Sequence, residues 1–163
     1  MATVSLAQAV GVNKAPVQTS NLKTVYKIWY EVDLAEAVTA KGSALATGDI
    51  IEAVRVPAGH LVLAAAAKKS AALTGTAADL LIDVGITGVD ADAYVADWDF
   101  DAAAVGSYAT PPAAAVPLVV STSDTIDLLL AFTGTVTGGK IEVHAVVADL
   151  THESRGAIAQ PKS

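Results

Sequence analysis

Apolar and polar residues alternate most regularly between residues 24 and 34. Every second side chain there is apolar, which is the pattern of a β-strand with one buried face. The apolar positions are Tyr26, Ile28, Tyr30, Val32 and Leu34. Trp29 lies on the opposite, polar face of this predicted strand. It is either covered by a loop of its own chain or forms an anchor at a contact with another subunit, where tryptophan is enriched.

Residues 48–69 contain two apolar runs that are separated by a single break, Pro57-Ala58-Gly59. Proline fixes its own φ and glycine accepts backbone angles that other residues avoid, so this break suits a β-turn. The stretch therefore predicts a strand, a tight turn and a second strand, which together form a hairpin.

Four later segments repeat the alternation, and each is predicted to be a strand. They are residues 79–86, 94–100, 125–132 and 140–150. In the second of them the aromatic residues are expected to face the core. The last two are joined across residues 134–139, which are rich in glycine, and are expected to form another hairpin.

Three stretches between these strands are interpreted as loops. Residues 35–47 are rich in alanine, but Lys41-Gly42-Ser43 argues against a helix there. Residues 70–78 are small and polar, and residues 102–117 contain prolines that a central strand would not tolerate.

The whole pattern amounts to seven or eight strands without a convincing helix, which predicts an all-β fold of the antiparallel β-sandwich type. Eight strands with a few long crossings favour a jelly-roll-like topology, and an immunoglobulin-like topology is the alternative. The sandwich domain is expected to span residues 23–150. It is expected to lie between an extended N-terminal arm, residues 1–22, and a C-terminal tail, residues 151–163.

The predicted arm shows no sustained period, so we expect it to be dispensable for folding. It nevertheless carries apolar side chains that could be buried on another chain. These are Val4, Leu6, Val10, Val12 and Val17. Together with Trp29 they are the candidate partner-binding residues, and the alternative for the arm is a disordered terminus.

Composition adds that much of the surface is expected to be covered by other molecules. Charged residues make up 17% of the 163 residues, against ~25% in typical soluble chains, while 53% are hydrophobic. Exposing surfaces with so little charge to water is energetically unfavourable, so we expect the chain to associate with itself as a homotrimer.

Charge and hydropathy exclude two classes of partner. The net charge of −7 and the pI near 4.7 disfavour nucleic acid, whose phosphates need a basic surface. The longest apolar run, residues 61–67, is far shorter than a membrane-spanning helix, so no membrane partner is expected. Residues 1–20 lack the features of a signal peptide, which predicts synthesis and retention in the cytoplasm.

An acidic cluster is the most suggestive candidate for chemistry. Three of its members have the spacing of the first ligands in a helical calcium loop: Asp97, Asp99 and Asp101. The loop is excluded because Ala102 and Tyr108 stand where glycine and glutamate are needed. A looser cation site at Asp90 and Asp92 stays open, with a solvated acidic rim as the alternative.

No other motif indicates catalysis or a cofactor. His60, His144 and His152 lie on different segments without the spacing of a metal site, and the chain has no cysteine. No Gly-x-Ser-x-Gly elbow and no phosphate-binding loop is present. We therefore assign no catalytic residue, cofactor or metal ligand, and expect the protein not to be an enzyme.

Several segments resemble the small structural proteins that decorate or cement the capsids of tailed bacteriophages. They are the start rich in threonine and alanine, the strand of residues 23–34, the stretch 48–60 and the segment from Asp83-Val84-Gly85 to Asp92-Ala93-Tyr94. The resemblance implies a β-sandwich bound outside the shell of the major capsid protein, commonly as a trimer. It implies no catalytic residues, synthesis in the host cytoplasm and a final location on the virion capsid surface.

The alternative function is a carbohydrate- or receptor-binding module of a phage tail or fibre. Such a module would use Trp29 or Trp98 as a platform on which a sugar ring stacks. It needs exposed aromatic rings beside polar groups, whereas the aromatic share of 5% is low and most rings are predicted to face the core.

Overall fold

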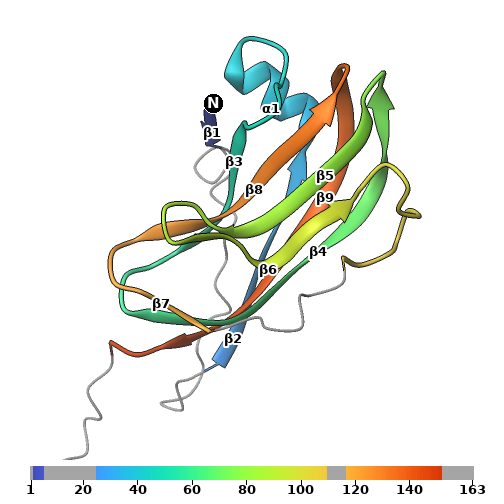
Figure 1. Ribbon diagram of the computed structural model, residues 1–163. Helices are drawn as coiled ribbons and strands as arrows, with labels where there is room; N and C mark the ends of the chain where they lie inside the picture. The colour runs from blue at the N-terminus through green and yellow to red at the C-terminus, as the bar shows by residue number, and fades with distance from the viewer. Residues whose placement is uncertain (1, 6–24, 110–116, 152–163) are drawn as a thin grey trace, which may run out of the picture.

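The computed structural model describes residues 2–5, 25–109 and 117–151, which form two β-sheets packed face to face (Figure 1). One sheet has five strands, in the spatial order β1 (Thr3–Ser5), β3 (Ile50–Val56), β8 (Asp124–Thr133), β5 (Ala78–Ile86) and β6 (Asp90–Asp99). The other has four strands, in the order β2 (Val25–Asp33), β9 (Val136–Asp149), β4 (His60–Gly75) and β7 (Leu118–Val120). The predicted all-β sandwich is confirmed.

The strand pairing is that of a jelly roll. The chain runs as one long antiparallel ribbon in which β2 pairs with β9, β3 with β8, β4 with β7, and β5 with β6. Successive pairs of this ribbon lie in alternate sheets, as in the double-sheet jelly roll. β1 joins the outer edge of β3 in parallel. This pairing decides between the two topologies left open above in favour of the jelly roll.

Neither predicted hairpin forms, because the strands on either side of each turn belong to different sheets. β3 lies in the five-stranded sheet and β4 in the four-stranded sheet, so the turn at Pro57-Ala58-Gly59 carries the chain across the sandwich. β8 and β9 are likewise separated at Gly134-Thr135. A turn signal shows that the chain reverses, but the pairing partners of both strands come from distant parts of the sequence.

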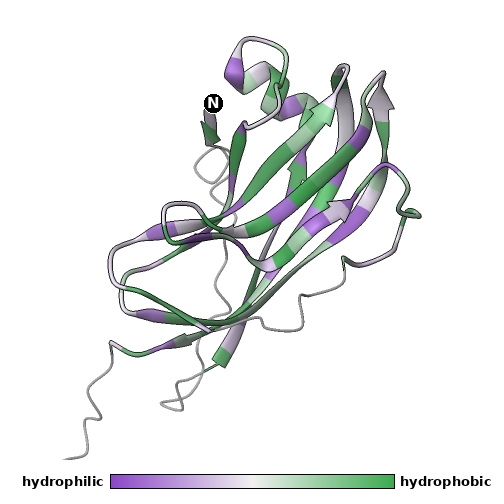
Figure 2. Cartoon of the chain, viewed as in Figure 1, coloured by the Kyte–Doolittle hydropathy of each residue, from purple (hydrophilic) through white to green (hydrophobic). Residues whose placement is uncertain are grey.

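The core lies between the two sheets and contains the apolar faces predicted for the clearest strands. Figure 2 shows that much of the length of the strands is hydrophobic. The inward-facing side chains of β5 are fully or almost fully buried. They are Leu80, Ile82, Val84 and Ile86. Tyr94 of β6 and Phe100, directly after it, are buried as predicted. Asp97 has φ of 49° and breaks the alternation, so that Val95 is also buried and Ala96 is exposed.

The loop predicted for residues 35–47 is wrong in its first half, which forms the helix α1 (Leu34–Lys41). The Asp33 side chain accepts a hydrogen bond from the Ala35 N–H at 2.8 Å and so caps the N-terminus of the helix. Gly42 ends the helix with φ of 72°, the left-handed conformation that glycine adopts without strain. The residues interpreted as a loop signal are therefore the end of a helix.

The start of the chain belongs to the sandwich. β1 pairs with β3, and Val4 is only 4% exposed within the hydrophobic core. The expected role of Val4 on a partner is therefore wrong, because its side chain is already buried in its own chain. Leu6, Val10, Val12 and Val17 lie outside the described residues.

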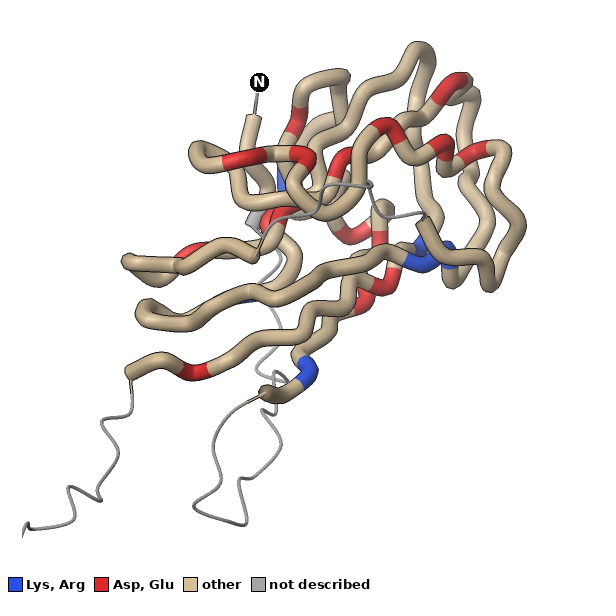
Figure 3. Tube along the Cα trace, turned by 60° about the horizontal axis from the view of Figure 1, so that its bottom comes forward, with Lys and Arg blue, Asp and Glu red and all other residues tan. Residues whose placement is uncertain are grey.

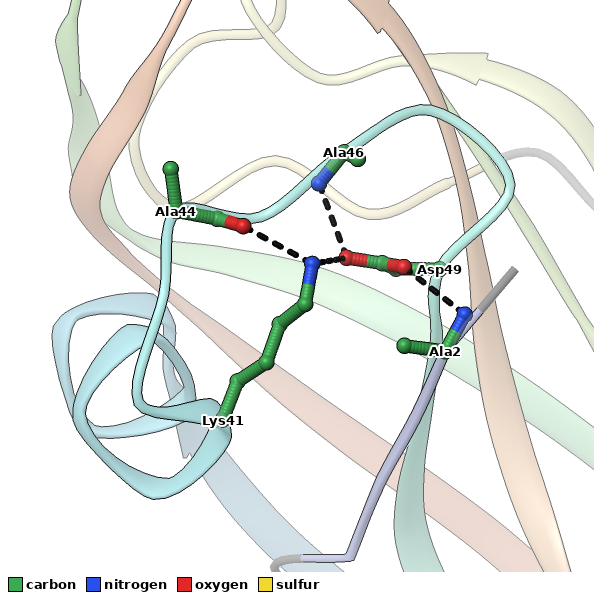
Figure 4. Close-up of polar contacts among 5 residues, drawn as sticks. All are labelled: Ala2, Lys41, Ala44, Ala46 and Asp49. Atoms are coloured by element: carbon green, nitrogen blue, oxygen red, sulfur yellow. Dashed lines mark hydrogen bonds and ion pairs between the residues drawn. The ribbon is translucent and has the colours of Figure 1, made fainter.

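A buried carboxylate fixes this first segment (Figure 4). Asp49 is 1% exposed and accepts hydrogen bonds from the N–H groups of Ala2 at 3.0 Å and Ala46 at 2.8 Å. The ammonium group of Lys41 forms an ion pair with the same carboxylate. Asp49 thus joins residues at the start of the chain, the end of α1 and the loop before β3.

The predicted loop at residues 70–78 is also wrong in part, because β4 continues to Gly75. Lys69 of β4 is buried and donates from Nζ to the carbonyl oxygens of Phe100 at 2.6 Å and Ala103 at 2.8 Å. It holds the segment after β6 against the edge of the four-stranded sheet. In the described part of the chain, no helix has the length and apolar character needed to cross a membrane.

Candidate interaction surface

The outward face of the four-stranded sheet combines aromatic, apolar and charged side chains. Alternate residues of β2, β9 and β4 point away from the core, as the burial patterns of these strands show. We call these residues the four-strand face: Lys27, Trp29, Glu31, Ala64, Ala66, Lys68, Glu142, His144 and Val146. The exposed large hydrophobic side chains on or beside it are Val25, Trp29, Tyr108, Val119, Val146 and Leu150. This concentration of exposed apolar groups makes the face a candidate contact surface.

Three rings form a row across the middle of this face. Trp29 of β2 lies opposite His144 of β9 in the strand register, and their ring centroids are 6.2 Å apart. Tyr108 forms an isolated β-bridge with Lys68 at the edge of β4. The centroid of its ring lies 6.3 Å from that of His144. We call Trp29, His144 and Tyr108 the ring row. Its two ends are open to solvent, because Trp29 is 54% and Tyr108 60% exposed.

Charged groups lie directly beside the ring row. Glu142 lies 3.3 Å from Lys68 and 3.1 Å from Nε2 of His144. The Lys68 ammonium is 6.0 Å from the centroid of the Tyr108 ring, within the range of a cation–π contact. The surface therefore offers flat apolar rings together with hydrogen-bonding groups, which is the composition of a protein contact patch.

The surroundings of His144, at the centre of the row, lower its pKa and so favour the neutral ring. Burial lowers its pKa, the charge of Lys27 lowers it further, and Glu142 opposes this only in part. With Nε2–H directed at Glu142, the Nδ1 atom is buried and has no hydrogen-bond partner among the described residues. Protonation of His144 would therefore add an Nδ1–H group that has no acceptor among the described residues.

Of the residues predicted from the sequence, Trp29 is the one that the structure places on this surface. It projects from an exposed strand face, and no loop of the described chain buries it. Trp98 is half-buried and packs edge-on against Phe100 at 5.3 Å, so it offers no open platform. His144 and Tyr108 were not predicted, because the register that brings them to Trp29 joins distant strands.

The acidic segment lies on the other sheet. Figure 3 shows acidic residues in red on much of the chain and few basic residues in blue. Burial raises the pKa of Asp83, and the nearby charges of Asp97 and Asp92 add to the shift. A hydrogen bond with Asp92 raises the pKa of Asp90. Within residues 2–5, 25–109 and 117–151, no three or more acidic or histidine side chains are grouped to hold a metal ion.

The fold is similar to chains from two solved bacteriophage capsid structures. A chain in the capsid of Ralstonia phage GP4 is 20% identical, with a TM-score of 0.62, over 93% of this chain and 100% of that one. A chain in the cyanophage Pam1 capsid asymmetric unit is 15% identical, with a TM-score of 0.53, over 87% of this chain and 99% of that one. No family model and no curated protein matches the sequence. At these identities the likeness concerns the fold.

Proposed function

We propose that this chain is a non-enzymatic structural protein of a bacteriophage virion. It binds the outside of the capsid and stabilises contacts between subunits of the major capsid protein. After synthesis in the host cytoplasm it is located on the virion surface. The observation that carries this proposal is the exposed ring row on a jelly roll whose fold matches capsid chains along almost their whole length.

The ring row is the proposed centre of the capsid contact. Trp29 and Tyr108 expose more than half of their surface, and each ring lies beside His144, with centroids 6.2 and 6.3 Å from the His144 ring. Aromatic side chains that are already ordered lose little conformational entropy on binding and are common binding hot spots. The small side chains of Ala64 and Ala66 beside them leave room for a partner to approach the sheet closely.

The residues of the predicted arm supply a second proposed contact with the major capsid protein. Leu6, Val10, Val12 and Val17 would each gain about 1 kcal/mol or more if they were buried on the capsid. Replacing all four with serine is expected to weaken capsid binding and to leave the melting temperature unchanged. Unchanged binding of the quadruple variant would limit the contact to the sandwich.

The test of the proposed function is binding of the purified chain to capsids assembled without it, followed by cosedimentation. Trp29→Ala is expected to weaken binding by about 2 kcal/mol, the cost typical of a hot-spot residue. Val89→Ala is the matched control, because Val89 is 67% exposed but lies in the turn between β5 and β6. Equal binding of both variants would show that the ring row is not the contact, and no binding of the wild type would contradict the function.

A carbohydrate- or receptor-binding role is the second candidate, favoured by the polar groups of Lys68 and Glu142 beside the two exposed rings. Titration of the isolated protein with polysaccharides of the host surface tests it. Binding that is lost in both Trp29→Ala and Tyr108→Ala would support this role, and binding to naked capsids alone would support the structural one.

The homotrimer expected from the sequence stays a prediction, because the described residues carry no observation of a threefold contact. Light scattering at tens of micromolar measures it directly. A mass of three chains would agree with the prediction, a doubled mass would contradict it and agree with pairing through β2, and a single-chain mass would count against any self-association.

A further inference from the structure

The edge strand β2 differs from the other sheet edges. β1 and β7, two of the four edge strands, are three residues long, and β6 has two register shifts against β5. β2 is nine residues long and pairs with β9 without a shift from Val25 to Asp33. Among the described residues its other edge is unpaired. A long, regular, unpaired edge is a template for pairing with another strand, and proteins usually interrupt or cover such edges.

The residues of β2 are complementary to a second, antiparallel copy of the same strand. If Trp29 lies opposite Trp29 of that copy, Lys27 of each chain lies opposite Glu31 of the other. Both opposite-charge pairs and the central aromatic pair are of the kinds that stabilise antiparallel strands. On the inward side, the same register places Ile28 opposite Tyr30 twice.

The free chain leaves these groups available for such pairing. Lys27 forms no ion pair with another described residue, and Glu31 keeps a 38% exposed side chain beside its contact with Lys140 at 3.2 Å. Tyr26, Ile28 and Tyr30 pack against the core but are only partly buried, whereas Val32 further along β2 is completely buried. Within residues 2–5, 25–109 and 117–151, the core is thus incompletely covered along this edge, and a second strand would cover it.

We propose that two copies of this chain associate through β2, antiparallel about Trp29, to join their four-stranded sheets into one. The contact is isologous, because each copy contributes the same residues. It places the two ring rows end to end on one continuous face. A nine-residue strand contact is smaller than the ~1,200–2,000 Å² interfaces of stable dimers, so association at tens of micromolar is expected. The inference does not depend on the proposed capsid binding.

The charge pattern gives a test with its own internal control. Lys27→Glu makes the β2 edge acidic at both positions, and Glu31→Lys makes it basic at both. In each single variant, two pairs of like charges then face each other across the contact. The association constant is expected to fall by about tenfold or more. Mixed together, the two variants restore both opposite-charge pairs and are expected to form a heterodimer.

Light scattering at 10 to 100 micromolar, roughly the range expected for so small an interface, measures the mass of each sample. We expect about twice 16.4 kDa for the wild type, about 16.4 kDa for each single variant, and the doubled mass again for their mixture and for the double variant K27E/E31K. Arg55→Glu is the matched control, since Arg55 is exposed on the other sheet, and it should keep the doubled mass. Melting curves confirm that each variant is folded.

Three results would overturn the inference. They are a wild type that stays monomeric, a mass of three chains, and a doubled mass that neither single charge reversal reduces. The double variant keeps the test decisive if a single variant is unstable, because it retains both charges in exchanged positions. Capsid binding measured on the same variants is a separate result, so failure of pairing and failure of the proposed function can be told apart.

Discussion

Asp49 shows at the scale of single residues how the chain holds distant segments together. Its carboxylate is almost inaccessible to solvent, yet it is paired with Lys41 and accepts two backbone N–H groups. A buried charge with all its partners is tolerated, whereas removing one partner leaves unpaired groups in the interior. No pattern in the sequence marks this aspartate among the many others.

We therefore expect Asp49→Asn to lower the free energy of unfolding by about 3 kcal/mol, measured with urea. Asp79→Asn is the matched control, because Asp79 is exposed and should change the stability by no more than about 0.5 kcal/mol. Similar small effects of both substitutions would show that the buried ion pair contributes little.

The same variant gives a pH-dependent prediction. Burial alone would raise the pKa of Asp49, but the hydrogen bonds from Lys41, Ala46 and Ala2 outweigh it and hold the pKa below its ordinary value. The stabilisation is therefore complete above the unfolded-state pKa of about 3.9 and is lost as the pH falls through the lower folded-state pKa. The stability difference between wild type and Asp49→Asn should shrink in that range, and a constant difference would contradict this assignment.

At the scale of elements, alternation predicted the strands but not their partners. The inward face from Leu80 to Ile86 was identified because every second residue is apolar, and its burial needs no knowledge of the rest of the chain. The two expected hairpins were wrong because the turns at Pro57 and Gly134 connect different sheets. Pairing between β2 and β9 also decides which rings meet, so Trp29 was predicted as a contact residue while His144 was not.

The helix α1 was missed because its two end signals were assigned to other structures. Gly42 caps the helix with positive φ, and a Cβ atom built there meets nothing within 4 Å. Gly42→Ala should therefore cost about 1 kcal/mol in thermal or urea unfolding, from backbone strain alone. Gly42→Asn should cost less, because asparagine tolerates the left-handed conformation better. Equal stability of all three proteins would mean that the cap does not stabilise α1.

β1 turns the start of the chain into part of the fold. Val4→Ala removes two methyl groups from the core and should lower the free energy of unfolding by about 2 kcal/mol, measured with urea. Deleting residues 2–5 should cost more, because the donor of Ala2 to Asp49 is lost as well. A deletion without effect on stability would restore the expectation that the N-terminal segment serves binding alone.

At the scale of the whole molecule, the two outer surfaces of the sandwich have different chemistry. The four-strand face carries the ring row and small side chains. The five-stranded sheet carries acidic residues such as Asp83, whose carboxylate accepts a hydrogen bond from the backbone N–H of Asp97. The negative charge of the five-stranded sheet repels anionic partners. We therefore expect the four-strand face to be turned toward the capsid and the acidic sheet toward solvent.

The most direct test of this account is a cryo-electron microscopy reconstruction of the virion or of capsids reconstituted with the purified chain. The account predicts density for the jelly roll on the outer surface of the shell, with Trp29 and Tyr108 in contact with the major capsid protein. Density inside the shell or only on the tail would contradict it. A capsid contact made by the acidic sheet instead of the four-strand face would contradict the proposed orientation.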